Sequence, residues 1–276
     1  MFELPEFVTL ARQINETLYG QEISSGKLGN SPHKFVWYNQ TPEAFAMLVA
    51  GKRVGRARAR GRWLLVPLEP GYMLVFGECG GKLIYQPANS PIPAKYHLFL
   101  QLKDGGFLWA LTQMWGAYEL YESGKEQNRQ YIKDMRPTPI DATFTDVYFN
   151  QLLDTLILGE KRSVKSLLTA DQLIPGLGNS SAQDIMFRAR LHPRHPIADL
   201  SPEQRLELYE AILSIVGEII IKGGRSDETD LYNRPGLYQR LMDSKTAGTP
   251  CPVCGTKIEK IQYLGGACYF CPNCQV

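Results

Sequence analysis

The sequence has no long hydrophobic run, almost no cysteine before its C-terminal end and, over one stretch, no acidic residue. No apolar stretch reaches the roughly 18 residues that a membrane-spanning helix needs, and the longest candidate, residues 211–221, is interrupted by Gly217 and Glu218. The first six residues, MFELPE, carry two acids and lack the basic start of a signal peptide. We therefore expect no membrane association and a cytoplasmic location with reduced thiols.

The acidic residues are missing from residues 51–67, which contain six basic ones. The chain as a whole is nearly balanced, with 30 basic and 28 acidic residues in 276. Its 44% apolar and 21% charged content is typical of a soluble globular protein with one large domain or two modest ones. A local basic bias on a nearly neutral protein indicates a surface that meets nucleic acid.

Within this stretch, RARARGRW (residues 56–63) has an arginine at every second position. In one extended strand, Arg56, Arg58, Arg60 and Arg62 would share a face. Their spacing of about 6.6 Å would be close to that of successive phosphates along a nucleic-acid strand, and the guanidinium fork suits phosphate. A strand edge that meets only water is the alternative, so a phosphate-binding role needs support from elsewhere in the chain.

The order of the patterns predicts a β-rich part followed by a helical part. Residues 5–19 have apolar side chains at helical spacing, and a short helix is expected after Thr41, with Pro42 in its first position and Gly51 at its end. Short β-rich runs follow to about residue 112, which predicts a β-sandwich or barrel-like unit. After a proline-containing linker at residues 135–141, helices are expected over residues 145–158, 163–169, 180–190 and 202–222.

Four of the six cysteines form two CxxC pairs that are separated by 16 residues. Cys251, Cys254, Cys271 and Cys274 therefore have the spacing of a tetrahedral zinc site, which would be structural because four thiolates leave no open position. Chance pairs or disulfides are the alternative, and a redox role would need a single CxxC at a helix start. The remaining cysteines, Cys79 and Cys268, are expected to be small buried hydrophobic residues.

Two weaker signals lie at expected helix starts. In LIPGLGNSSAQDIMFRARLHP (residues 173–193), Gly176 and Gly178 predict a tight turn, and Asn179 stands where the next helix begins. Free backbone N–H groups at such a point suit a phosphate, although plain packing is the commoner use of such a turn. The acids of MFELPE, Glu3 and Glu6, could serve only to cap the first helix.

Together these residues resemble the formamidopyrimidine-DNA glycosylase and endonuclease VIII family of base-excision repair enzymes. The resemblance covers the whole chain and rests on motifs in the family's order: ELPE, RGRWLL, LIPGLGNSSAQDIMFRARLHP, GGRSDETDLYNRPGLYQRLM, CPVCG and YFCPNCQ. It implies an α+β multidomain fold with an N-terminal β-sandwich flanked by helices (residues 1–135), a helix-two-turns-helix domain (141–244) and a zinc finger (245–276). It also implies a monomer, nucleoid-associated if bacterial, that binds double-stranded DNA at a damaged base or abasic site, with the damaged base flipped out.

The sequence departs from the family where the chemistry begins. The family has a proline after the initiator methionine, and its secondary amine attacks C1′ of the damaged nucleoside to form a Schiff base. This chain has Phe2, which predicts that Met1 is retained and that the Phe2 nitrogen is an amide without a usable lone pair. Glu3 matches the acid that protonates the sugar ring oxygen, and Glu6 is also kept.

Two further positions of the resemblance differ. The family's β-hairpin lysine aligns with Arg62, which can hold phosphate but cannot shuttle a proton. The finger arginine that grips DNA phosphate aligns with Gly266, whereas the phosphate-binding asparagine is kept as Asn179. The resemblance thus implies that the DNA-binding architecture is retained, whereas the nucleophilic proline is absent.

Three functions remain open at this point. The favoured one is a protein that binds damaged DNA without cutting it. The second is an active glycosylase and lyase with a substitute amine, either the Met1 α-amine or a lysine such as Lys52. The third is a zinc-ribbon protein that binds another protein, which would leave the arginines unexplained.

Overall fold

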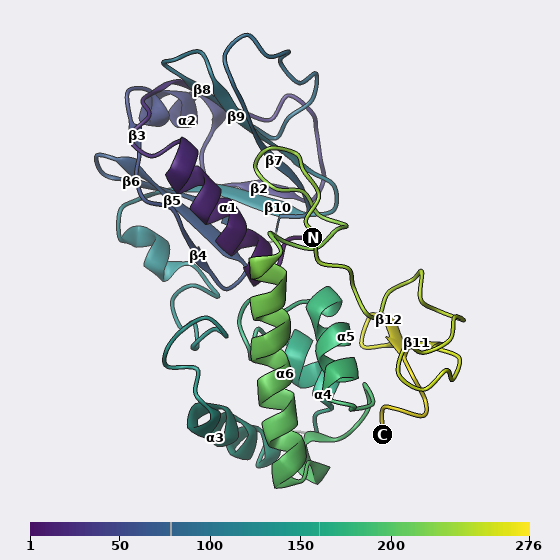
Figure 1. Cartoon of the computed structure of the whole chain (residues 1–276). Coiled ribbons are helices and arrows are strands. Elements are labelled where there is room, and N and C mark those ends of the chain that lie inside the picture. The colour runs from purple at the N-terminus through teal and green to yellow at the C-terminus, as the bar shows by residue number, and fades with distance from the viewer. Residues whose placement is uncertain (78, 160) are drawn as a thin grey trace. The chain divides into compact units, whose positions relative to one another are not determined.

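The computed structural model describes residues 1–77, 79–159 and 161–276, and it contains two compact units (Figure 1). Unit 1 comprises residues 1–135 and 220–238, and unit 2 comprises residues 136–219 and 239–276. The late segment 220–238 therefore folds with the N-terminal residues. Among the described residues, no helix has both the length and the apolar character that crossing a bilayer requires.

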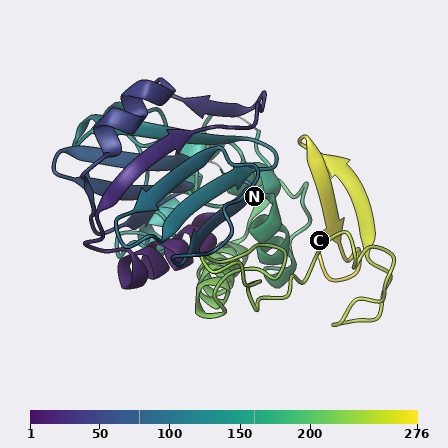
Figure 2. The same cartoon turned by 90° about the horizontal axis from the view of Figure 1, so that it is seen from above.

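Two β-sheets face one another in unit 1 (Figure 2). The four-stranded sheet has the order β1 (Ile23–Leu28), β8 (Leu98–Leu102), β9 (Phe107–Thr112), β7 (Gly81–Gln86). The other has the order β2 (Val36–Tyr38), β10 (Gly116–Glu122), β6 (Tyr72–Gly77), β5 (Trp63–Glu69), β3 (Arg53–Val54), and β4 (Arg58–Arg60) also pairs with β5. These strands confirm the predicted β-rich part.

Strand alternation explains why β5 is buried on both sides. Leu64, Val66 and Leu68 enter the core between the sheets, because alternate side chains of a strand point to one face. Trp63 and Leu65 point the other way and join a second apolar cluster on the outer face of the sheet. The six-stranded sheet therefore has a covered outer face as well as a buried inner one.

The helices of unit 1 begin where their capping residues stand. The helix α1 (Leu4–Thr17) has a reciprocal capping box between Glu3 and Glu6 and buries Phe7, Leu10 and Ile14 against the sandwich core. The helix α2 (Pro42–Val49) is capped by the Thr41 side chain, which accepts a hydrogen bond from the Ala44 N–H at 3.2 Å. A 3₁₀ helix, η1 (Lys125–Asn128), follows β10.

Unit 2 is largely helical, as predicted. It contains α3 (Asp146–Ile157), α4 (Val164–Thr169), α5 (Asn179–Arg188), the 3₁₀ helix η2 (Ile197–Asp199), the start of α6 (Pro202–Ile221) and a hairpin of β11 (Glu259–Tyr263) and β12 (Gly266–Phe270). The helix α6 begins at the predicted capping box. The Gln204 N–H donates to Ser201 Oγ at 3.2 Å, and the Ser201 N–H donates to Gln204 Oε1 at 3.0 Å.

The prediction that RARARGRW forms one strand is wrong. The strand β4 ends at Arg60, the chain turns through Gly61 and Arg62, and Trp63 begins β5 opposite Arg60. Gly61 has a φ of 58°, which glycine adopts at little cost, so it permits a tight turn inside the arginine repeat. Arg62 therefore lies on the turn of a β-hairpin and does not continue the row of Arg56, Arg58 and Arg60.

Candidate functional site

The N-terminal acids are buried at the start of α1. Glu3 and Glu6 are each 3% exposed, and the Glu3 N–H donates to Glu6 Oε2 at 2.9 Å. Capping is therefore one role of these carboxylates. Their burial calls for a positive partner, because an unpaired charge in the protein interior is costly.

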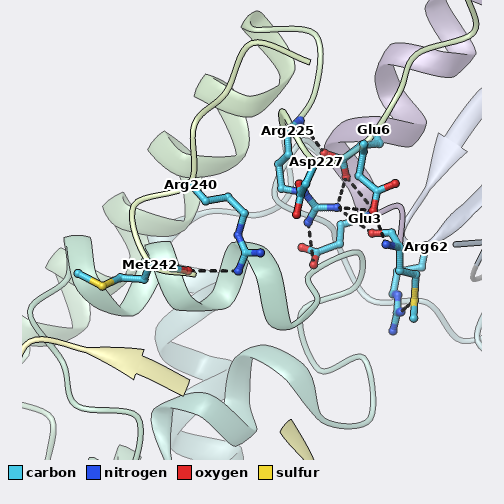
Figure 3. Close-up of polar contacts among 9 residues, drawn as sticks. Glu3, Glu6, Arg62, Arg225, Asp227, Arg240 and Met242 are labelled. Atoms are coloured by element: carbon cyan, nitrogen blue, oxygen red, sulfur yellow. Dashed lines mark hydrogen bonds and ion pairs between the residues drawn. The ribbon is translucent and has the colours of Figure 1, made fainter. Parts of the chain in front are cut away.

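That partner is Arg225, from the segment that follows α6 (Figure 3). Its side chain is 1% exposed, and its Nη1 and Nη2 atoms lie 3.0 Å from Glu3 Oε1 and 3.2 Å from Glu6 Oε2. Nη2 also donates to the Met1 carbonyl oxygen at 2.7 Å. Two further carboxylates lie 3.6 Å from the guanidinium, those of Asp227 and Glu228.

This acidic cluster contains more acidic groups than basic ones. Four carboxylates, those of Glu3, Glu6, Asp227 and Glu228, surround the Arg225 guanidinium, and the second cation is the Met1 ammonium group, which pairs with Glu228. Burial disfavours the charged guanidinium, but the attraction of Glu6, Glu3 and Glu228 outweighs it and raises the pKa of Arg225. Burial raises the pKa of Glu6 against the opposing attraction of Arg225. Arg225 is the central positive charge of the site.

Sequence reasoning did not identify Arg225. Its partners lie more than two hundred residues away along the chain, so no local pattern marks the contact. The signal in the sequence is the stretch GGRSDETD, in which a single arginine precedes three acids. The two glycines bring this stretch against α1, since a Cβ atom on Gly224 would lie 3.6 Å from Glu6 Cγ.

The first two residues are held by packing and hydrogen bonds. The Phe2 N–H donates to the Cys79 carbonyl oxygen at 2.9 Å. The Phe2 ring is 1% exposed and meets Phe7 edge-on, with 5.8 Å between ring centroids. The Met1 sulfur accepts a hydrogen bond from Arg62 Nη2. The nitrogen at position 2 is thus an amide engaged in backbone pairing.

The four predicted arginines have different surroundings. Arg56 and Arg58 are exposed, whereas Arg60 and Arg62 are half-buried. The Arg56 guanidinium stacks over the Tyr19 ring at 4.7 Å, and Arg60 Nη1 donates to Gln127 Oε1 at 3.3 Å. Arg56 and Arg58 are therefore placed to meet an anion from solvent, and Arg62 lies beside Met1.

In unit 2, Asn179 is the first residue of α5, after the N-cap Gly178. Its Nδ2 atom donates to the Ala267 carbonyl oxygen at 3.4 Å, which ties the helix start to the β11–β12 hairpin. A Cβ atom on Gly266 would lie 3.5 Å from Asn179 Oδ1. Asn179 and Gly266 are therefore neighbours.

Sequence reasoning also missed Lys165 of α4, which is 1% exposed. Its Nζ atom donates to the Tyr263 carbonyl oxygen and lies 3.5 Å from the Gly266 carbonyl oxygen. A buried ammonium group is thus satisfied by the turn of the hairpin. A lysine within a short amphipathic helix gives no sign of this contact in the sequence.

The four tail cysteines form a site that can hold a metal ion. Their sulfur atoms lie within 4.8 Å of one another, with 3.9 Å between Cys251 and Cys274 and 3.4 Å between Cys254 and Cys271. A tetrahedron with metal–sulfur bonds of about 2.3 Å has sulfurs about 3.8 Å apart, so the arrangement fits zinc. Hydrogen bonds from Thr256 lower the pKa of Cys254 to about 6, whereas the hydrogen bond with Cys254 raises the pKa of Cys274 to about 12, so the four sulfur groups hold their protons unequally.

The other two cysteines are buried and form no disulfide. Cys268 is 0% exposed and Cys79 is 6% exposed. The prediction that they are small buried residues outside the metal site is confirmed.

Two family profiles match the chain in succession. The formamidopyrimidine-DNA glycosylase N-terminal domain matches residues 1–130, and the formamidopyrimidine-DNA glycosylase H2TH domain matches residues 135–230. A formamidopyrimidine-DNA glycosylase of Symbiobacterium thermophilum is 30% identical over 281 residues, which is 100% of this chain and 89% of the relative. That of Chloroflexus aurantiacus is 30% identical and covers 100% of this chain and 98% of the relative.

Solved structures agree with these matches. The Lactococcus lactis Fpg protein in a complex with DNA containing an abasic site is 25% identical, with a TM-score of 0.86 over 99% of both chains. A MutM structure in complex with DNA containing carbocyclic 8-oxo-G has the same identity, coverage and TM-score. The fold of this chain is thus that of proteins solved on damaged DNA.

The acidic cluster leads to a stability prediction. Replacing Arg225 by methionine (Arg225→Met) leaves Glu3 and Glu6 buried without their cation, and we expect it to lower the free energy of unfolding by about 3–5 kcal/mol. The ion pair between Arg12 and Glu16, whose side chains are both exposed, is the control, since Arg12→Met should cost less than about 1 kcal/mol. Urea denaturation measures both variants.

Adding Glu3→Gln and Glu6→Gln to Arg225→Met should restore part of the lost stability, because the buried negative charges are then removed. Equal losses in Arg225→Met and Arg12→Met would contradict this account of the cluster.

Proposed function

The chain belongs to the formamidopyrimidine-DNA glycosylase family, and from this premise we propose that it binds duplex DNA at a damaged base or abasic site without cutting it. The observation that carries the proposal is the state of the N-terminal site. The nitrogen of Phe2 donates to the Cys79 carbonyl oxygen, and the Glu3 carboxylate is paired with Arg225 at 3.0 Å. The two groups that family chemistry needs are both engaged in holding the fold together.

The family reaction needs an amine with a free lone pair and an acid with a proton to give. The Phe2 nitrogen is an amide, whose lone pair is delocalised into the carbonyl group. The Glu3 carboxylate is engaged in an ion pair with the Arg225 guanidinium. Arg62, at the position of the family lysine, stays protonated at every working pH. The amine nucleophile and the lysine of the family reaction are therefore absent, and the acid is engaged in another contact.

The DNA-binding groups do not depend on that chemistry. Arg56 and Arg58 present exposed guanidinium groups on the β4–β5 hairpin, and Asn179 stands at the start of α5, where backbone N–H groups suit a phosphate. Phosphate contacts supply most of the affinity for duplex DNA and position a protein on it. We propose that these residues hold the DNA and that Cys251, Cys254, Cys271 and Cys274 hold one structural zinc ion.

An active enzyme that uses the Met1 α-amine is the second candidate. The amine belongs to the same acidic cluster as Glu3, which favours this candidate. Its ammonium group pairs with Glu228, however, and an ammonium group is not a nucleophile until it loses its proton. The binding function therefore has the stronger support.

The first test asks whether the protein forms a Schiff base with abasic-site DNA. Wild-type protein should bind the duplex, leave it uncut and give no adduct on borohydride reduction. Phe2→Pro should yield a trapped adduct, because it permits methionine removal and places a secondary amine next to Glu3. Adding Arg62→Lys should speed turnover by restoring a group that can move a proton.

Phe2→Leu is the matched control, because it changes the side chain while keeping Met1 and the amide. It should remain untrapped. A strong adduct from wild-type protein that disappears when the α-amine is blocked would instead identify Met1 as the nucleophile.

The second test concerns the hairpin arginines. Arg58→Ala and Arg60→Ala should weaken binding about equally for all duplex sequences and flatten the slope of log affinity against log salt by about one unit per lost phosphate contact. Arg12→Ala on α1 is the control, since Arg12 is exposed and pairs with Glu16. Fluorescence anisotropy over a salt series gives the slopes, and an unchanged slope in both hairpin variants would mean that these groups face only water.

The third test measures the metal. Native mass spectrometry of the purified protein should find one zinc ion per chain, and Cys254→Ser should lose it and unfold the β11–β12 hairpin, because metal binding and folding of such a unit are coupled. Cys268→Ala is the control that should keep the zinc. Wild-type protein with well under one zinc per chain would refute the assignment.

A further inference from the structure

A pocket of about 150 Å³ opens on unit 1, apart from the acidic cluster. It lies over β2, β5, β6 and β10 and the segment that follows η1, and its walls include Trp37, Trp63, Gly77, Arg129 and Tyr131. Three of these five residues are aromatic. Trp37 and Tyr131 are 51% and 45% exposed, so large aromatic faces are offered to solvent around a hollow.

One wall of the pocket is formed by Trp63 and by Arg129, which forms an ion pair with Glu119. The Arg129 guanidinium stacks over the Trp63 ring at 4.3 Å from its centroid, and Arg129 Nε donates to Glu119 Oε2 at 2.8 Å. The Trp63 ring occupies the space beside Gly77, where an added Cβ atom would lie 1.6 Å from Trp63 Cζ3. Glycine at this position is thus what lets the indole form the wall.

The other wall includes a strained residue. Tyr131 has a φ of 67°, in the left-handed region that bulky residues rarely adopt. The next residue, Ile132, is 0% exposed and belongs to the apolar cluster on the outer face of the sheet, so the packing of the chain can hold this conformation. Such strain concentrates at ligand-binding and functional sites.

We propose that this pocket binds one unpaired pyrimidine base of DNA. The proposal rests on the proposed DNA-binding function and adds a second contact to it. A cavity of about 150 Å³ accommodates a single six-membered ring. Exposed aromatic faces such as those of Trp37 and Tyr131 are the platforms on which unpaired bases stack, whatever the base.

The position of the pocket beside the arginine hairpin favours a nucleic-acid base over another flat ligand. Trp63 pairs in register with Arg60 across the hairpin, and Arg60 donates to Gln127, two residues before Arg129. Arg60 of the hairpin is therefore linked through Gln127 to the segment that contributes Arg129 to the pocket wall. A DNA strand held by its phosphates at Arg58 and Arg60 would have a stacking site for a displaced base close by.

The test compares two duplexes that carry the same one-nucleotide bulge, with thymine in one and a tetrahydrofuran abasic analogue in the other. The two DNAs differ only in the unpaired base, so the ratio of their dissociation constants reports its binding. Recognition of the abasic site itself also enters this ratio, so the pocket is tested by its change in variants. Trp37→Ala and Tyr131→Asn should each weaken binding of the thymine bulge about fivefold or more, while affinity for the abasic bulge stays unchanged.

Asparagine is chosen for position 131 because it tolerates the left-handed conformation while removing the ring. Phe35→Ala is the matched control, since Phe35 is as exposed as Tyr131, at 45%, and does not line the pocket. Its ratio should equal that of wild type.

A ratio that both pocket variants keep would overturn the base pocket and leave the proposed DNA binding intact. Failure of wild-type protein to bind either duplex would overturn the proposed function and the pocket together.

Discussion

The guanidinium group of Arg225 is the contact on which the N-terminal site depends. It joins two parts of unit 1 that are remote in sequence: the N-terminal residues, through the carbonyl oxygen of Met1 and the capping acids of α1, and the segment 220–238. Its two closest carboxylates, those of Glu3 and Glu6, are buried, and it forms an ion pair with each of them. Removing one partner of such a cluster leaves unpaired buried charge, so its members hold one another in place.

This constraint bears directly on function. In our proposal the Glu3 carboxylate is engaged by Arg225 and does not serve as a proton donor. The same cluster engages the Met1 ammonium group through Glu228. In our proposal, catalysis would require the Glu3 carboxylate to leave its ion pair with Arg225. DNA binding through surface phosphate contacts has no such requirement, so a chain can lose the chemistry and keep the binding.

Local patterns in the sequence predicted the features that depend on neighbouring residues. The capping signals at Thr41 and Ser201 gave the starts of α2 and α6, and the cysteine spacing gave the four-sulfur cluster. The arginine repeat was misread because alternation predicts a strand only while the backbone stays extended, and Gly61 allows a turn. That turn separates Arg62 from the other three arginines.

The features that no local pattern could predict are contacts between distant segments. Arg225 forms an ion pair with Glu3, which lies near the other end of the sequence. The aromatic pocket brings together Trp37 and Tyr131, which are also far apart in the sequence. Family resemblance indicated Glu3 as an acid but said nothing of the arginine beside it. Only the folded chain brings such groups together, because their pairing is decided by the packing of the sheets and of segment 220–238.

A crystal structure of the wild-type protein bound to a duplex with an abasic-site analogue would test the central claim most directly. The measurement is the distance between Arg225 Nη1 and Glu3 Oε1 in the complex, which is 3.0 Å in the free protein. Our account predicts that this ion pair persists while DNA is bound. An Arg225 side chain that has left the cluster, with Glu3 in contact with the sugar of the abasic site, would contradict it.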